Sequence, residues 1–175
     1  MPFPAYFSDM PVSFSRPEVV VRVLSGFVWD AIMFRQWQDS LLGHAPPPRL
    51  AKPGSTMIHV TDPQSLAVCT TAEDFAYRLS LRLTQPRPRA FVPGRDPLQD
   101  IRLFGCALIY FQPAPGTRID VPPPTPVHGG LPANWGLTSG GAREWLLHDN
   151  PILDGNLMDV FFVNTSGTRW GPIRP

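Results

Sequence analysis

The chain has 175 residues and carries 15 basic and 14 acidic side chains, which leaves a net charge of +1 at neutral pH. This balance argues against a broad electrostatic grip on nucleic acid. Apolar residues supply 43% and charged residues 17% of the sequence, enough to build a core and too little charge for a disordered chain. With 23 prolines and 14 glycines, one compact, loop-rich domain is expected.

The chain ends and the cysteines narrow the class further. Residues 1–17 hold four prolines and several aromatic side chains, which predicts an extended arm ahead of a single domain at 18–175. We expect neither a cleaved signal peptide nor a membrane span, because no apolar run of the required length occurs. Cys69 and Cys106 fit neither a zinc site nor a CxxC motif, so buried, inert thiols are expected, with a single disulfide as the alternative.

In chain order, apolar runs separated by proline and glycine predict strands and helices. Strands are expected at 18–24, 55–60, 101–113 and 157–164. Helices are expected at 29–42 and 63–84, although the second half of the latter segment alternates and would also fit a strand. Gly43 is a stop signal for the first helix, and Asp62 followed by Pro63 is a start signal for the second. Loops are expected at 45–53, 85–97 and 113–141, a short apolar segment at 143–149 and a turn at 165–167. Early helices and late strands indicate an α+β fold.

Three polar features occur in apolar settings. Arg22 lies in the middle of a β-branched run, where it needs an anion or carbonyl partner if buried, or points outward from an edge strand. Ser55 and Thr56 open a predicted strand, which is also ordinary turn chemistry. Glu144 follows the glycine-rich run 136–141, either as an exposed side chain or as a carboxylate presented by a loop. The common nucleotide-binding and hydrolase motifs are missing and the histidines lack metal-ligand spacing, so we expect no metal.

The order of these features resembles the mono-ADP-ribosyltransferases of the cholera- and pertussis-toxin type. Four segments that together cover most of residues 18–165 carry the resemblance: VVVRVLSG at 19–26, GSTMIHV at 54–60, CALIYFQPAPGTRIDV at 106–121 and GGAREWLLHDNPILDGNLMDVFFVN at 140–164. The first matches the strand that holds the family's arginine, the second its Ser-Thr-Ser strand, and the last its catalytic-glutamate block.

The resemblance implies an ADP-ribosyltransferase-like fold, in which two small, mostly antiparallel sheets and a few helices flank an NAD cleft. It assigns NAD binding to Arg22, His44, Ser55 and Thr56. It makes Glu144 the catalytic carboxylate, which stabilises the positive ribose of the transition state and is held in place by Ser55. The implied reaction cleaves the nicotinamide–ribose bond of NAD and transfers ADP-ribose to a protein or nucleic-acid acceptor.

Two positions depart from the family pattern. Met57 stands where the third motif residue is serine. Ala142, two residues before the glutamate, stands where family members carry Glu or Gln to orient the acceptor, which leaves open an unusual acceptor or plain NAD hydrolysis. Phe14, Phe27 and Trp37 are the candidate aromatic walls for nicotinamide.

The resemblance also implies a biological role and leaves two alternatives open. A toxin or effector domain would be secreted or delivered into a target cell without a cleaved signal, and a neutralising immunity protein would be a further partner; otherwise the chain is cytoplasmic. The alternatives are a non-enzymatic binding module, such as an immunity or adaptor protein, and a structural protein of a virion or secretion machine.

Overall fold

The computed structural model describes residues 15–29, 33–50, 54–79, 97–122, 126–127, 131–132, 136–138, 140–149, 151 and 157–174. Within them a seven-stranded antiparallel sheet has the order β4-β7-β2-β1-β3-β8-β9, and β5 and β6 form a separate hairpin. The strands are β1 (Val20–Ser25), β2 (Ile58–Thr61), β3 (Cys106–Phe111), β4 (Ile119–Asp120), β5 (Pro126–Val127), β6 (Leu131–Pro132), β7 (Glu144–Leu147), β8 (Leu157–Val163) and β9 (Arg169–Trp170). The helices are α1 (Gly26–Val28), α2 (Phe34–Leu41), α3 (Pro63–Leu66), α4 (Ala72–Arg78) and α5 (Pro97–Phe104).

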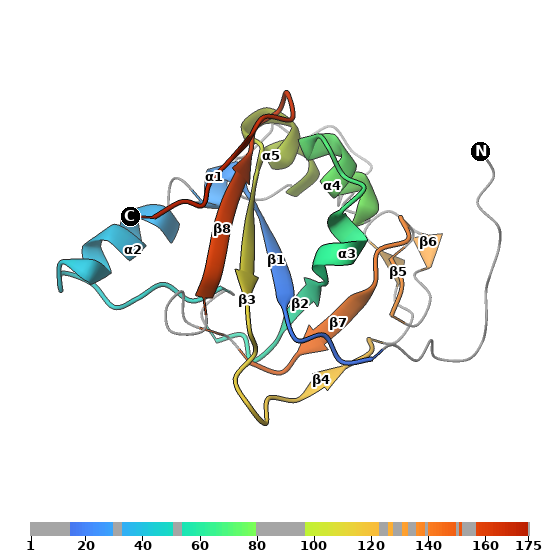
Figure 1. Ribbon diagram of the computed structural model, residues 1–175, viewed down its shortest axis with the longest axis horizontal. Coiled ribbons are helices and arrows are strands. Elements are labelled where there is room, and N and C mark those ends of the chain that lie inside the picture. The colour runs from blue at the N-terminus through green and yellow to red at the C-terminus, as the bar shows by residue number, and fades with distance from the viewer. Residues whose placement is uncertain are drawn as a thin grey trace.

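The sheet separates two hydrophobic cores. Figure 1 shows α2 on one side of the sheet and α3 and α4 on the other. The helix α2 closes the first core through Trp37, and α3 to α5 close the second core through residues such as Phe75 and Ile101. Neighbouring residues of β1 serve both cores, since Val20 faces the first and Val21 the second, as strand alternation requires.

The pairing between β1 and β2 is the shortest between neighbouring strands of the sheet. Six successive residues of β1 pair with β3, from Val20 opposite Phe111 to Ser25 opposite Cys106. By contrast, β1 and β2 share the single pair Val21 and Thr61. The strands β1, β3 and β8 stand side by side in Figure 1, whereas β2, β7 and β4 continue the sheet below and to the right of them. The pairing of β1 with β2 is therefore much shorter than that of β1 with β3.

The predicted fold class is confirmed at the coarse level, since mostly antiparallel strands combine with a few helices. The structure shows one sheet of seven strands where two small sheets were expected. Strands predicted at 18–24 and 157–164 are observed as β1 and β8. The turn predicted at 165–167 is also present, and Gly167 adopts a φ of 88° there.

Several predicted boundaries are wrong. The strand predicted at 101–113 begins with the second half of α5, which ends where Gly105 takes a φ of 76° and donates its N–H to the carbonyl of Ile101. The helix predicted at 63–84 is two helices, α3 and α4, the second starting with a capping box between Thr71 and Asp74. The loop predicted at 113–141 contains the short strands β4, β5 and β6.

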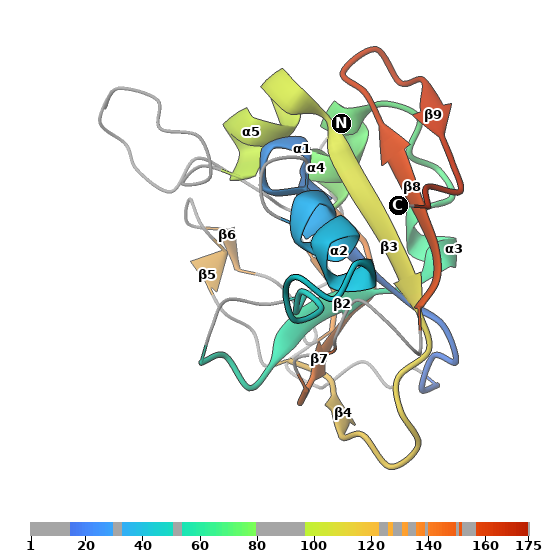
Figure 2. The ribbon, with the colours of Figure 1, turned by 90° about the vertical axis from the view of Figure 1, so that its left-hand side faces the viewer.

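Of the remaining predictions, some are confirmed and others concern residues that the structure does not describe. The helix predicted at 29–42 is observed as α2, and Gly43 follows it with a φ of 75°. Most of the N-terminal arm, and the loop at 85–97 apart from its last residue, lie outside the described residues. Among the described helices, none is long and apolar enough to cross a bilayer. In Figure 2 the side of the molecule that carries α2 faces the viewer.

Both cysteines are free thiols, which rules out the disulfide alternative. They belong to the second core, Cys106 fully buried and Cys69 at its edge. Burial raises the pKa of Cys69 to about 11 and that of Cys106 to about 12. The thiols therefore stay protonated at neutral pH, which agrees with the expectation of inert cysteines.

Candidate functional site

The site begins with a histidine–carboxylate pair on neighbouring strands. In the register of β2 with β7, Thr61 lies opposite Glu144 and His59 lies opposite Leu146, so the two side chains are diagonal neighbours on one face. His59 Nδ1 lies 2.9 Å from Glu144 Oε1. The side chains are 55% and 25% exposed, respectively, so the imidazole is accessible while the carboxylate is largely covered.

The chemistry of the pair fixes which ring nitrogen carries the proton. A carboxylate only accepts hydrogen bonds, so His59 Nδ1 is the donor, and in a neutral imidazole the lone pair is then on Nε2, on the other side of the ring. Glu144 has a second oxygen, and its hydrogen bonds among the described residues involve Oε1 alone. The pair thus offers one oriented imidazole nitrogen and one carboxylate oxygen.

Arg22 reaches this pair from the opposite face of the sheet. In β1, Arg22 pairs with Ile109, which faces the first core. Glu144 pairs with Thr61, and Thr61 pairs with Val21, which faces the second core. Arg22 and Glu144 are therefore on opposite faces of the sheet. The guanidinium reaches across to β2. There its Nη1 donates to the main-chain carbonyl of His59 at 2.9 Å.

The environment of the Arg22 guanidinium favours an anion. Its Nε is shielded from solvent and has no hydrogen-bond partner among the described residues. Desolvation lowers the pKa of Arg22, and the negative charge of Glu144 partly opposes this shift. A desolvated cation with an unused donor gains most from a charged acceptor such as a phosphate oxygen.

The segment before Glu144 folds back on itself. Leu137 and Arg143 form a β-bridge, and the Glu144 N–H donates to the carbonyl of Gly136 at 2.9 Å. Within this turn the Thr138 hydroxyl accepts from the N–H of Ala142 at 2.9 Å. The carboxylate expected at the end of a flexible loop is therefore held at the start of a strand by a hydrogen-bonded turn.

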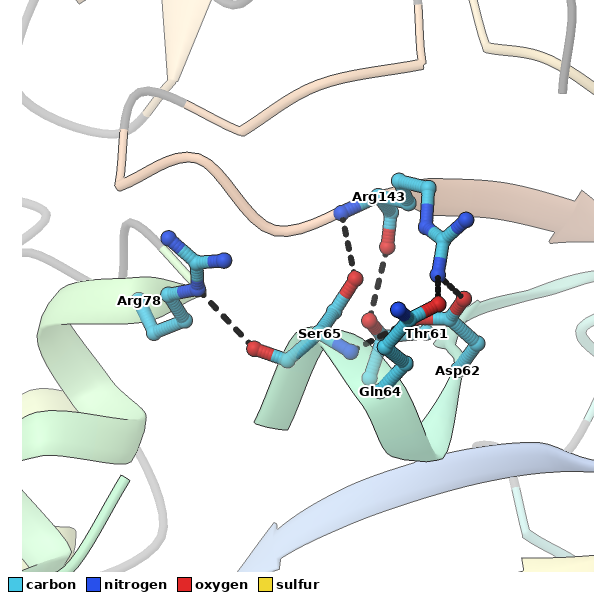
Figure 3. Close-up of polar contacts among 6 residues, drawn as sticks. All are labelled: Thr61, Asp62, Gln64, Ser65, Arg78 and Arg143. Atoms are coloured by element: carbon cyan, nitrogen blue, oxygen red, sulfur yellow. Dashed lines mark hydrogen bonds and ion pairs between the residues drawn. The ribbon is translucent and has the colours of Figure 1, made fainter. Parts of the chain in front are cut away.

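Arg143 ties this turn to the start of α3 (Figure 3). Its guanidinium pairs with the buried Asp62 carboxylate, and its Nη2 donates to Gln64 Oε1 at 2.6 Å. Its main-chain N–H donates to Ser65 Oγ at 2.9 Å, and its carbonyl accepts from Thr61 Oγ1 at 2.7 Å. Both the side chain and the backbone of the residue next to Glu144 are thus fixed.

Arg78 ties the same turn to α4. Its Nε donates to the carbonyl of Ser65 and its Nη1 to the carbonyl of Gly140, each at 2.9 Å. The Arg78 carbonyl accepts from the Thr138 hydroxyl at 2.6 Å. Gly140 lies so close to α4 that a Cβ there would overlap the carbonyl oxygen of Tyr77. We call the contacts of Asp62, Arg78 and Arg143 the turn clamp.

The structure does not bring the other predicted site residues to Glu144. Ser55 lies before the start of β2, and its hydroxyl donates to the carbonyl of Met57 at 2.8 Å, so it does not hold the glutamate as expected. Thr56 and Met57 are exposed beside it. The residue that contacts Glu144 is His59, two positions beyond the expected Ser-Thr-Ser register.

His44 lies just after α2, which packs on the face of the sheet opposite to Glu144. It is exposed, and its N–H completes the helix end by donating to the carbonyl of Asp39 at 2.9 Å. Among the candidate aromatic walls, Trp37 is buried in the first core, Phe27 packs on Phe104, and Phe14 lies outside the described residues.

Sequence reasoning missed His59 and the turn clamp. One signal was present, because Ile58, His59, Val60 and Thr61 alternate apolar and polar as in a half-buried strand. Their polar face carries the site. The described residues contain no group of three or more acidic, histidine or cysteine side chains that could hold a metal ion.

The fold and the site together define the class: an α+β protein with a seven-stranded antiparallel sheet, and a histidine–carboxylate pair near a partly buried arginine where β1 meets β2. Comparisons with protein families, with curated proteins and with solved structures gave no match to this chain.

Proposed function

We propose that the chain cleaves the nicotinamide–ribose bond of NAD and transfers ADP-ribose to an acceptor. The observation that supports this best is the convergence of Arg22 and Glu144 on His59, one through its main-chain carbonyl and the other through its ring. An anion-binding guanidinium next to a lone catalytic carboxylate is what this substrate requires. The resemblance to the mono-ADP-ribosyltransferases adds the choice of NAD.

Glu144 is the catalytic carboxylate of the proposal. When the bond to nicotinamide breaks, its electron pair leaves with the nicotinamide nitrogen and positive charge develops on the ribose. A carboxylate fixed beside the ribose stabilises that charge more in the transition state than in the substrate, which is the requirement for catalysis. The second oxygen, Oε2, is the one that the contact with His59 leaves for a ribose hydroxyl.

Arg22 binds the pyrophosphate in this proposal. Its Nη1 is committed to the His59 carbonyl, and its unpaired Nε supplies a charge-assisted hydrogen bond to a phosphate oxygen. The bond to the His59 carbonyl fixes the guanidinium relative to the pair. Ser55 and His44 are not used in this proposal, because their hydrogen bonds go to Met57 and Asp39 and not to the pair, and Thr56 is exposed beside Ser55.

The test is nicotinamide release from NAD by the purified chain. We expect turnover by the wild type, and a loss of about 100-fold or more in Glu144→Gln, since one preorganised electrostatic group typically contributes that much. Arg22→Lys should weaken NAD binding, because an ammonium cannot reproduce the guanidinium geometry. Glu73→Gln, in an exposed ion pair with Arg102 on α4 and α5, is the matched control and should keep full activity.

The alternatives predict different results. Neither a binding module nor a structural protein of a virion or secretion machine should bind or cleave NAD, and the latter should self-assemble at moderate protein concentration. A wild type that gives no nicotinamide and no heat of NAD binding would refute the enzyme proposal. Label from NAD that appears on protein or nucleic acid in a cell lysate would identify a macromolecular acceptor.

On the resemblance we also propose a role as a toxin or effector domain. Expression of the wild type inside a target cell should then arrest growth, and Glu144→Gln should not. An immunity protein that neutralises the chain should relieve the arrest when it is expressed together with the wild type. Equal growth of cells that express either variant would contradict the toxin role.

A further inference from the structure

The orientation of His59 points to a second catalytic group in the site. Its Nδ1 is engaged by Glu144 at 2.9 Å, and more than half of the side chain is exposed. A carboxylate that fixes Nδ1–H leaves Nε2 as an oriented base, the arrangement by which enzymes activate hydroxyl nucleophiles.

We propose that His59 is the general base that removes a proton from an acceptor hydroxyl, so that the acceptor of ADP-ribose is an oxygen nucleophile. The proposal rests on the proposed NAD cleavage and identifies its acceptor class. Water is the simplest such acceptor, and a hydroxyl group of a macromolecule has the same chemistry.

The step balances without a further reagent. The bond between ribose C1′ and the nicotinamide nitrogen breaks, and nicotinamide leaves with the electron pair. The acceptor oxygen forms its bond to C1′ while its proton moves to His59 Nε2, and the proton then passes to solvent. Glu144 serves both stages, because Oε1 holds the imidazole and stabilises it when it becomes positively charged, and Oε2 faces the ribose.

The turn before Glu144 is consistent with an oxygen acceptor. Ala142 is completely buried and its N–H donates to Thr138, so this position offers no side chain to an incoming acceptor. Arg143 is occupied by Asp62 and Gln64. His59 is thus the exposed base that directly contacts Glu144, and a neutral imidazole can accept a proton from a hydroxyl but offers no carboxylate to a cationic guanidinium.

The experiment compares His59→Asn with His59→Ala, using water and azide as acceptors. Asparagine keeps a donor for Glu144 but has no nitrogen at the position of Nε2, whereas alanine removes both. We expect turnover with water to fall by about 100-fold or more in His59→Asn, the usual contribution of a general base. Azide carries no proton to remove, so it should restore turnover of this variant and yield the ribosyl azide.

Two controls separate the base from other roles. His148→Asn removes a second histidine that lies against a carboxylate, 2.8 Å from Asp120 on the edge strand, and should keep wild-type turnover. Glu144→Gln should not recover with azide, because it loses stabilisation of the ribose and not of the acceptor. Thermal unfolding of each variant shows whether it is folded at the assay temperature.

Three results would overturn the inference. Wild-type turnover of His59→Asn with water would show that His59 only positions Glu144. Failure of azide to restore that variant, while it remains folded and binds NAD, would show that proton removal is not its role. A wild type that cleaves no NAD would remove the proposed function itself, a distinguishable outcome because it does not depend on residue 59.

Discussion

The turn clamp gives the most direct test of how the structure holds Glu144, and Asp62 is its central residue. One carboxylate oxygen, Oδ1, accepts from the N–H of Ser65 at 2.9 Å and caps α3. The other, Oδ2, pairs with Arg143. The Asp62 side chain is 10% exposed and the Arg143 side chain 30%, so the pair is shielded from solvent but not completely. Asp62→Asn keeps the cap and removes the charge, whereas Asp62→Ala removes both.

The expected magnitudes follow from this geometry. Removing one partner of a fully buried pair costs about 3–5 kcal/mol, and an exposed pair is worth at most about 1 kcal/mol. Because Arg143 keeps Gln64 and some solvent, we expect Asp62→Asn to lower the free energy of unfolding by about 1–2 kcal/mol. Loss of the cap adds about 1 kcal/mol in Asp62→Ala. For a chain of this size these losses correspond to falls in Tm of about 2–8 °C and about 4–12 °C.

The assay is thermal and denaturant unfolding at pH 7, followed by circular dichroism, with Glu73→Gln as control. Glu73 forms an exposed bidentate pair with Arg102, so its loss should change the free energy of unfolding by less than about 1 kcal/mol. If Asp62→Asn is no less stable than Glu73→Gln, the ion pair with Arg143 does not hold the turn. If Asp62→Ala equals Asp62→Asn, the cap contributes nothing.

Three further predictions concern groups outside the clamp's ion pair. The pKa values of Cys106 and Cys69 are about 12 and 11, so both thiols should react slowly with iodoacetamide in the native protein at pH 8 and fast in guanidinium. Rapid labelling of Cys106 in the native protein, measured by mass spectrometry, would contradict its burial. Backbone hydrogen bonds lower the pKa of Asp74 from 3.8 to about 2, so its stabilising contribution is present above about pH 4 and lost as pH falls toward 2. Since the side chain is partly exposed, we expect this contribution to be about 1 kcal/mol. In Asp74→Ala the free energy of unfolding should therefore fall less steeply between pH 4 and pH 2 than in the wild type. Gly140→Ala should lower the free energy of unfolding by about 1–3 kcal/mol, because the added Cβ clashes with α4. Gly116→Ala, which has open space around it but a φ of 81°, should cost about 1 kcal/mol. Equal melting temperatures of the two variants would contradict the close approach of Gly140 to α4.

Local signals predicted the elements that depend on local geometry. The β-branched run around Arg22 is β1, and Asp62 caps the helix that Pro63 begins. The same signals failed where one apolar run crosses a boundary. Residues 101–111 are apolar almost throughout, so α5 and β3 could not be separated until the backbone of Gly105 was seen to turn between them.

The candidate site was predicted in part. Arg22 and Glu144 were identified from the sequence, and both belong to the site described above. The prediction that Ser55 holds Glu144 was wrong. The strand begins at Ile58, so the residues that pair across from Glu144 lie further along the chain than expected. A shift along a strand changes which residues share a face, so a motif placed a few residues early leads to the wrong hydrogen-bond partner.

The sequence by itself determined alternation, caps and glycine stops, because these follow from the backbone geometry of a few consecutive residues. The tertiary structure decided that β2 lies between β1 and β7. That placement joins His59 to Glu144, which are 85 residues apart, and brings the guanidinium of Arg22 to the same point. Strand order and register depend on which arrangement buries both faces of the whole sheet. That depends on contacts between segments far apart in the chain, which no short stretch of sequence reveals.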